Sequence, residues 1–128
     1  MDLEGLEADF SSQEIENVIR ELPNNKSLGL DGFSNEFIKG CWPLISSDFH
    51  SLCQAFHNSD ICLRSINSSF ITLIPRIDSP ISTNDYRPHS LLNSSMKIIT
   101  KFLANRLQTK IQRLIHQNQY GFIQKRTI

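Results

Sequence analysis

Three side chains capable of binding a metal share one face of a predicted helix. His50, Cys53 and His57 are spaced i, i+3 and i+7 in the second part of a helical segment at 35–58. Imidazole and thiolate groups are common zinc ligands. However, no fourth ligand is evident, and cysteine is often buried as a small hydrophobic residue. We therefore interpret this face as a partly buried packing surface, with a metal site as the alternative.

A loop at 26–33 contains two glycines that could let the backbone approach a ligand or another segment. Gly29 and Gly32 flank Asp31, and glycine permits tight turns and close approach. The spacing matches neither GxGxxG nor a Walker motif, so it is not a phosphate-binding fingerprint. We expect Asp31 to act as a turn or helix-capping residue.

The net charge of zero conceals two halves of opposite charge. Residues 1–60 carry three basic and eleven acidic side chains, whereas residues 61–128 carry ten basic and two acidic ones. The charges are therefore −8 and +8. A half this basic attracts polyanions such as nucleic acid or nucleotide phosphates. The alternative is that the two halves pack together and neutralise each other.

Length and composition favour one modest domain. The chain has 128 residues, of which 39% are hydrophobic, and no apolar run reaches the roughly 18 residues that a membrane span needs. The N-terminus is acidic and lacks the features of a signal peptide. The three cysteines have no CxxC spacing, which argues against a disulfide framework or a zinc finger. We expect an intracellular chain, in the nucleus or cytoplasm, without a membrane partner.

Periodicity and capping signals predict the first elements. Ser11 and Glu14 form a capping-box pattern that opens a helix with an apolar stripe ending at Leu22. The helical segment at 35–58 is expected to be interrupted at 40–43, because Pro43 disfavours helical geometry just before itself. Residues 68–76 read as a largely buried strand of about five residues.

The second half is predicted to contain one long helix. A polar loop at 77–88 and a short extended piece at 89–92 lead to a helix, capped by Asn93 or Ser94, that ends near Ile115. Its outer face carries a basic ridge that could contact a phosphate backbone or simply face solvent; the ridge comprises Lys97, Lys101, Lys110 and Arg113. Residues 119–126 look like the start of a strand or hairpin. The predicted fold class is α+β, mostly helical.

Five blocks of this sequence, in order, resemble the reverse transcriptase of non-LTR retrotransposons (LINE elements) in the version common in plant genomes. They cover about residues 10–128. The first is the lead-in at 10–22, 25–33 and 41–42. The others are ITLIPR at 71–76, similar to ITLIPK; NDYRPHSL at 84–91, similar to NDYRPISL; the helix at 97–107; and 119–128, similar to QSAFIxGRxI.

The resemblance implies part of a right-hand polymerase fold, with an acidic helical lead-in at 1–60 and a basic fingers segment at 61–128. The family role is RNA-templated DNA synthesis, with an RNA template or RNA–DNA duplex and a dNTP as partners. Arg76, Arg87 and Arg126 match the family positions near the incoming triphosphate and the template, and arginine suits bidentate phosphate binding. For Arg87, the alternative is a local ion pair with Asp85.

The same resemblance implies that the catalytic machinery lies elsewhere. In this family, palm aspartates downstream of the last block hold two metal ions, Mg²⁺ in the full-length enzyme. This sequence ends at that block, so we expect the palm to be missing, no catalytic residue or metal site in the chain, and no catalysis by it alone. The competing interpretations are a non-catalytic nucleic-acid-binding module and a non-functional structural relic.

Three positions depart from the family pattern. Leu28 and Leu30 replace the prolines of an SPGPDGF loop, and His89 replaces an aliphatic residue that should be packed. A buried histidine there needs a hydrogen-bond partner or carries a desolvation cost of roughly 1–3 kcal/mol. Without a palm to pack against, the apolar face of the helix at 94–115 is expected to be partly uncovered and the chain poorly stable.

Overall fold

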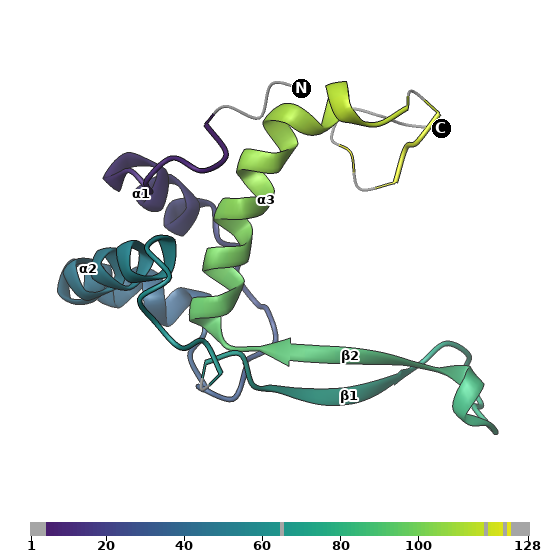
Figure 1. The fold of residues 1–128 in the computed structure, drawn as a ribbon. Helices are drawn as coiled ribbons and strands as arrows, with labels where there is room; N and C mark the ends of the chain where they lie inside the picture. Colours follow the sequence, from purple (N-terminus) through teal and green to yellow (C-terminus); the bar gives the residue numbers. More distant parts are fainter. Residues whose placement is uncertain (1–4, 65, 117, 122, 124–128) are drawn as a thin grey trace.

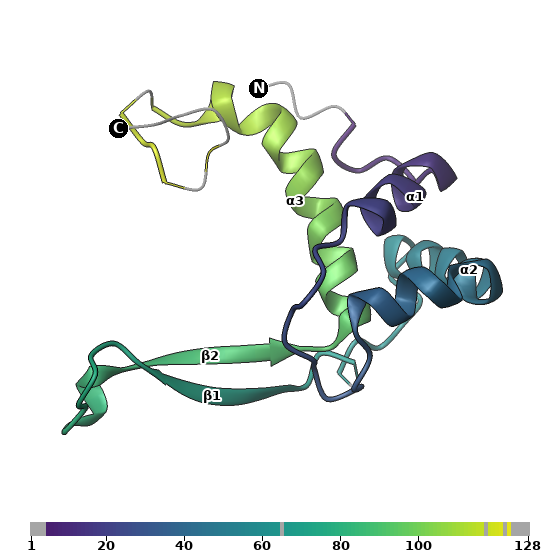
Figure 2. The same ribbon diagram turned by 180° about the vertical axis from the view of Figure 1, so that it is seen from behind.

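A computed structural model describes residues 5–64, 66–116, 118–121 and 123. The elements in order are α1 (Ser12–Glu21), α2 (Asn35–His57), β1 (Ser69–Pro75), a short 3₁₀ helix (Thr83–Asp85), β2 (Tyr86–Leu92) and α3 (Ser94–Leu114). The three helices lie together, while β1 and β2 form a hairpin that projects away from them (Figures 1 and 2). This agrees with the predicted α+β, mostly helical class.

Helix α1 begins at the predicted cap. The Ser11 side chain accepts a hydrogen bond from the Glu14 backbone N–H at 3.2 Å, and the buried residues Ile15, Val18 and Ile19 form the expected stripe. The second half of the predicted capping box is different. The Glu14 carboxylate is hydrogen-bonded to Arg106 on α3, so this residue serves a long-range contact as well as the helix start.

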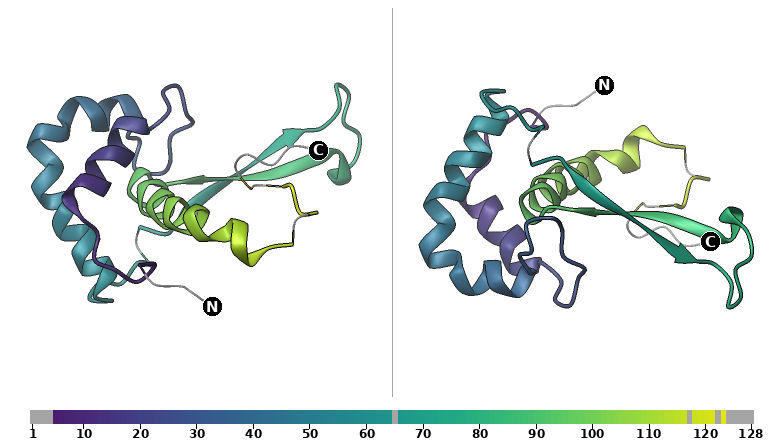
Figure 3. Two further views of the ribbon diagram at one scale, coloured as in Figure 1. Left: turned by 90° about the horizontal axis from the view of Figure 1, so that it is seen from above. Right: turned by 90° about the horizontal axis from the view of Figure 1, so that it is seen from below.

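The expected interruption at 40–43 is wrong. Helix α2 is continuous from Asn35 to His57 with Pro43 inside it. Proline removes one helical hydrogen bond and bends the helix rather than always ending it, and α2 curves around α1 when viewed along the vertical axis (Figure 3). Packing compensates for the lost bond, because Trp42 is buried and donates from Nε1 to Glu16 on α1 at 2.7 Å.

The hydrophobic core lies between the three helices. Phe10, just before α1, is a central member, with its ring 5.5 Å from that of Phe102 on α3. Cys53 on α2 is fully buried in the same cluster, as the packing interpretation predicted. The other buried members are Ile15, Val18, Ile19, Leu22, Ile38, Trp42 and Ile98.

The predicted single strand has a partner. Strands β1 and β2 pair antiparallel from Ser69↔Leu92 to Pro75↔Tyr86, so the extended piece expected at 89–92 begins earlier. The expectation that this strand is largely buried is wrong, since Ile71 and Leu73 remain 70% and 57% exposed. The sheet has two strands, and no helix among the described residues packs extensively on it, so an apolar composition alone did not produce burial.

Helix α3 has the predicted bounds but uneven burial. Its first turns contribute Ile98, Ile99 and Phe102 to the interior, whereas Leu103 and Leu107 are 41% and 44% exposed. The expectation that part of its apolar face is uncovered is therefore confirmed. Within the described residues, no helix combines the length and apolar content needed to cross a membrane. Residues 118–121 and 123 form no strand, and the remainder of the strand expected at 119–126 lies outside the described residues.

Candidate nucleic-acid interface

The loop at 26–33, called the glycine loop from here on, holds the start of α3. Asp31 accepts a hydrogen bond from the Ser94 backbone N–H at 2.6 Å through Oδ2, and its other carboxylate oxygen accepts from Phe33 N at 3.4 Å. Asp31 thus combines the expected turn and cap roles, and the helix it caps lies more than sixty residues away. Asn93 occupies the N-cap position, but its side chain makes no capping hydrogen bond.

The Asn93 side chain instead joins the loop to the base of the hairpin. Its Oδ1 accepts from the Asp31 backbone N–H at 3.1 Å, and its Nδ2 donates to the Ile66 carbonyl at 3.0 Å. Gly29 lies so close to the Leu92 carbonyl and the Asn93 Cα that a Cβ at Gly29 would overlap backbone atoms. The loop therefore fixes the point at which β2 passes into α3, and with it the direction of the hairpin.

Two predicted binding residues lie at the far end of this hairpin. Arg87 on β2 is paired in register with Ile74, and Arg76 follows β1, with its backbone N–H donating to the Asp85 carbonyl at 2.7 Å. Both arginines are exposed. Neither side chain forms an ion pair or hydrogen bond with a residue that the structure describes. The structure thus brings two arginine side chains to one end of an antiparallel pair.

The acidic residue closest in sequence to Arg87 is used by the backbone of the turn. Asp85 Oδ2 accepts hydrogen bonds from Ile81 N at 2.9 Å and Ser82 N at 2.8 Å. The hydrogen bond with Ser82, followed by that with Ile81, lowers the pKa of Asp85 below its ordinary value. Arg87 and Asp85, both described by the structure, do not form an ion pair with each other, so the alternative of a local ion pair is not supported.

The residues of the predicted basic ridge on α3 do not all have the same role, because one makes a structural contact and others are exposed. Lys97 Nζ donates to the Ser27 carbonyl at 2.6 Å, so this side chain helps to hold the glycine loop. Lys101 and Arg113 are exposed, and Lys110 is partly buried. Lys101 faces a cavity at the base of the hairpin together with Lys97, whereas Arg113 lies in the last turn of the helix.

His89 does not occupy the packed position expected from the family pattern. It is exposed on β2, so the expected desolvation cost does not apply. Leu28 and Leu30, which replace the loop prolines, are also exposed. Arg126 lies outside the described residues.

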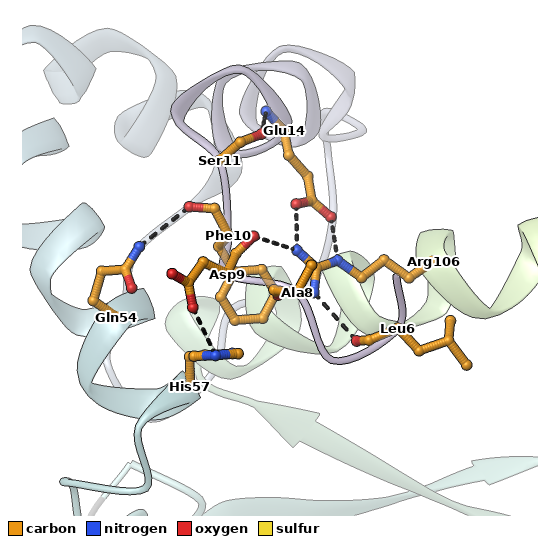
Figure 4. Close-up of polar contacts among 9 residues, drawn as sticks. All are labelled: Leu6, Ala8, Asp9, Phe10, Ser11, Glu14, Gln54, His57 and Arg106. Carbon is orange, nitrogen blue, oxygen red and sulfur yellow. Dashed lines mark hydrogen bonds and ion pairs between the residues drawn. The ribbon is translucent and has the colours of Figure 1, made fainter. Parts of the chain in front are cut away.

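Arg106 has a structural role that its charge alone did not indicate. It donates from Nε and one terminal nitrogen to the two Glu14 oxygens at 2.7 Å each. It also donates to the carbonyls of Leu6, Ala8 and Asp9 (Figure 4). Its guanidinium lies 4.4 Å from the centre of the Phe10 ring. The hydrogen bonds to Glu14 raise the pKa of Arg106, against the opposing effect of desolvation.

The face of α2 that carries His50, Cys53 and His57, for which a metal site was the alternative, makes packing and polar contacts within the protein. Cys53 is in the core, and burial raises the pKa of its thiol to about 12, with a smaller contribution from the nearby Glu14 carboxylate. His57 Nε2 lies 2.7 Å from Asp9 Oδ1 (Figure 4). No group of three His, Cys, Asp or Glu side chains suited to a metal ion occurs among the residues that the structure describes.

Comparison with known proteins connects this chain to a transposon. It is 33% identical over 126 residues, 98% of its length, to the Transposon TX1 uncharacterized 149 kDa protein of Xenopus laevis. The chain spans 10% of the length of that curated relative. No protein-family model matches the sequence. The chain is therefore a distant homologue of a small part of a transposon protein.

Proposed function

We propose that this chain binds the template and the incoming nucleotide's triphosphate as the fingers part of a non-LTR retrotransposon reverse transcriptase. The observation that carries the proposal is the pair of exposed arginines, Arg76 and Arg87, without a partner among the described residues at the far end of a projecting hairpin. The five sequence blocks and the homology to a transposon protein support it independently.

Electrostatics favour phosphate at this position. Arginine offers several N–H donors in a planar fork that matches two phosphate oxygens at once. The acid that could compete, Asp85, is occupied by the backbone N–H groups of Ile81 and Ser82. The basic residues of the segment at 61–128 other than Arg106, which pairs with Glu14, add a long-range attraction for polyanions, which salt screens.

By the family resemblance, the catalytic carboxylates lie outside the described residues. Asp31 and Asp85 both use their oxygens to cap backbone N–H groups, so they do not offer the free carboxylate pair that two Mg²⁺ ions require. Asp31 and Asp85 are therefore not assigned a role in metal-dependent catalysis. We expect the purified chain to incorporate no nucleotide when given a primed RNA template, dNTPs and Mg²⁺.

The remainder of such a polymerase is the proposed protein partner. The apolar side chains on the hairpin and on the later turns of α3, among them Ile71, Leu73 and Leu107, are exposed in this structure. Ile71 and Leu73 lie two residues apart on β1 and so share one face, and exposed apolar patches commonly mark a contact with another protein surface. A palm segment would cover these faces while leaving the arginine end of the hairpin available to phosphate.

The test is binding to a labelled RNA–DNA duplex with a single-stranded RNA template overhang, measured by fluorescence anisotropy at low salt. Arg76→Ala and Arg87→Ala should each weaken binding by about tenfold, because each removes a charge-assisted phosphate contact. Arg20→Ala removes the same charge from an exposed position on α1 and should leave the affinity within about twofold. Equal weakening by all three variants would contradict the proposal, as would no binding by the wild-type chain.

A further inference from the structure

A cavity of about 280 Å³ lies at the base of the hairpin, where β2 approaches the end of α1, the start of α2 and the first turns of α3. This volume is close to the lower limit of roughly 300 Å³ for small-ligand pockets. Part of its wall is apolar and is formed by Leu22, Pro23 and Leu91. The cavity is therefore suited to one small ligand that has an apolar part.

The rest of the wall is basic. Lys26, Lys97 and Lys101 line the cavity together with His89, and no Asp or Glu among the described residues lines it. Lys97 is held in place by the Ser27 carbonyl, 2.6 Å from Nζ, and its ammonium group retains two further N–H donors. Lys26 and Lys101 are exposed and have no hydrogen-bond or ion-pair partner among the described residues. Three ammonium groups around one small cavity favour an anionic ligand.

The cavity and Arg87 belong to one face of β2. Side chains two residues apart on a strand point to the same face, so Arg87, His89 and Leu91 share a face of β2. His89 and Leu91 line the cavity, and Arg87 continues the same row toward the far end of the hairpin. A polyanion lying along this face would meet Arg87 and the lysine-lined cavity in sequence.

We propose that this cavity binds a single unpaired nucleotide. The base lies against the His89 imidazole, because imidazole rings stack on unpaired bases, and against the apolar wall at Leu22 and Leu91, because apolar side chains pack on a base that has left the stack. The phosphate is held by the ammonium groups of Lys26 and Lys101, with Lys97 behind them. The identification of the ligand as a nucleotide rests on the proposed function, whereas the cavity and its lysines do not.

The experiment is a titration of the full chain, uniformly labelled with ¹⁵N, with adenosine monophosphate, followed by NMR. The backbone amides of residues 89–91, 97 and 101 should shift in a saturable manner. Lys101→Ala and His89→Ala should each weaken binding by about fivefold. The matched control Arg64→Ala removes an exposed charge of the same segment outside the cavity and should not change it. Adenosine alone and inorganic phosphate alone should each bind more weakly than adenosine monophosphate.

Two sources of the nucleotide are distinguished by a second ligand, a short single-stranded oligoadenylate. If it shifts the same amides at lower concentration than the mononucleotide, the site takes a template nucleotide. If only the mononucleotide does so, the site takes a free nucleotide, and the cavity assignment stands in both cases. Absence of cavity shifts with both ligands overturns the inference, and so does equal binding by Lys101→Ala and wild type. Duplex binding that depends on Arg76 and Arg87 would survive that failure, so the two proposals are tested separately.

Discussion

Arg106 on α3 and Glu14 on α1 form a bidentate ion pair, with both nitrogen–oxygen distances at 2.7 Å. The two side chains are 12% and 24% exposed. The pair joins the acidic and basic halves of the chain across 92 residues of sequence. The same guanidinium also fixes the segment before α1 through the carbonyls of Ala8 and Asp9. This contact ties the last long helix to the first one.

Loss of this contact should lower stability more than the loss of an exposed charge on the same helix. Arg106→Ala is expected to reduce the free energy of unfolding by about 2–4 kcal/mol, because it leaves Glu14 and several carbonyls without their donor. Arg106→Lys should restore only part of the loss, since lysine cannot form the planar fork. The control Lys101→Ala should cost no more than about 0.5 kcal/mol. Urea unfolding would measure all three, and equal effects for Arg106→Ala and Lys101→Ala would contradict the assigned role.

Alanine substitutions at two glycines should change the stability of the chain in opposite directions. Gly29→Ala should destabilise the chain by about 1–3 kcal/mol, because its Cβ overlaps backbone atoms of Leu92 and Asn93, which cannot move independently of the hairpin base. Gly40→Ala should stabilise it by about 0.5–1 kcal/mol, because Gly40 lies inside α2 with open space around it and alanine is the better helix former. Thermal unfolding by circular dichroism would report both. A stabilising Gly29→Ala would refute the docking of the loop described above.

The signals that were read correctly from sequence are local. The Ser11 cap, the helical stripe that follows it and the bounds of α3 depend on residues within a few positions of one another. Continuity of α2 through Pro43 was not predictable in this way, because it depends on Trp42 packing against α1 and donating to Glu16. The exposure of β1 was likewise missed, since burial of a strand depends on what covers it and not on its own composition.

The candidate site shows the same division. The sequence blocks singled out Arg76 and Arg87 as binding residues, but they predicted neither the hairpin that brings both to one end nor the lack of a described partner. Arg106 was counted with the other bases of the second half, although it is held by Glu14 and by carbonyls up to 100 residues away. In the sequence, Glu14 was assigned to the capping pattern at the start of α1. That pattern gave no indication that the Glu14 carboxylate pairs with Arg106.

Thiol chemistry tests the packing of the core. Burial raises the pKa of Cys53 to about 12, so this thiol is neutral at physiological pH and shielded from reagents. Cys62 is exposed and should react rapidly. Brief alkylation with iodoacetamide followed by peptide mass spectrometry should label Cys62 and leave Cys53 unmodified until denaturant is added. Equal labelling of both in the native chain would show that the core is not packed as described.

The end of the hairpin should be sensitive to acid. The lowered pKa of Asp85 means that its carboxylate stabilises the turn fully above its ordinary value of 3.8. This stabilisation is lost as the pH falls from that value through the lowered pKa, because protonation removes the acceptor for Ile81 N and Ser82 N. The protection of these two amides from exchange, relative to their intrinsic exchange rate at the same pH, should therefore fall below that value, and Asp85→Asn should lower it at neutral pH. Unchanged exchange in Asp85→Asn would contradict the capping role.

The most direct test of the central claim is the salt dependence of duplex binding. Each phosphate contact adds about 0.9 to the slope of the logarithm of the binding constant against the logarithm of salt concentration. If Arg76 and Arg87 both contact phosphate, the doubly substituted Arg76→Ala, Arg87→Ala chain should show a slope shallower than wild type by about two. A slope equal to that of the wild-type chain would show that the two arginines do not hold phosphate and would contradict the proposed function.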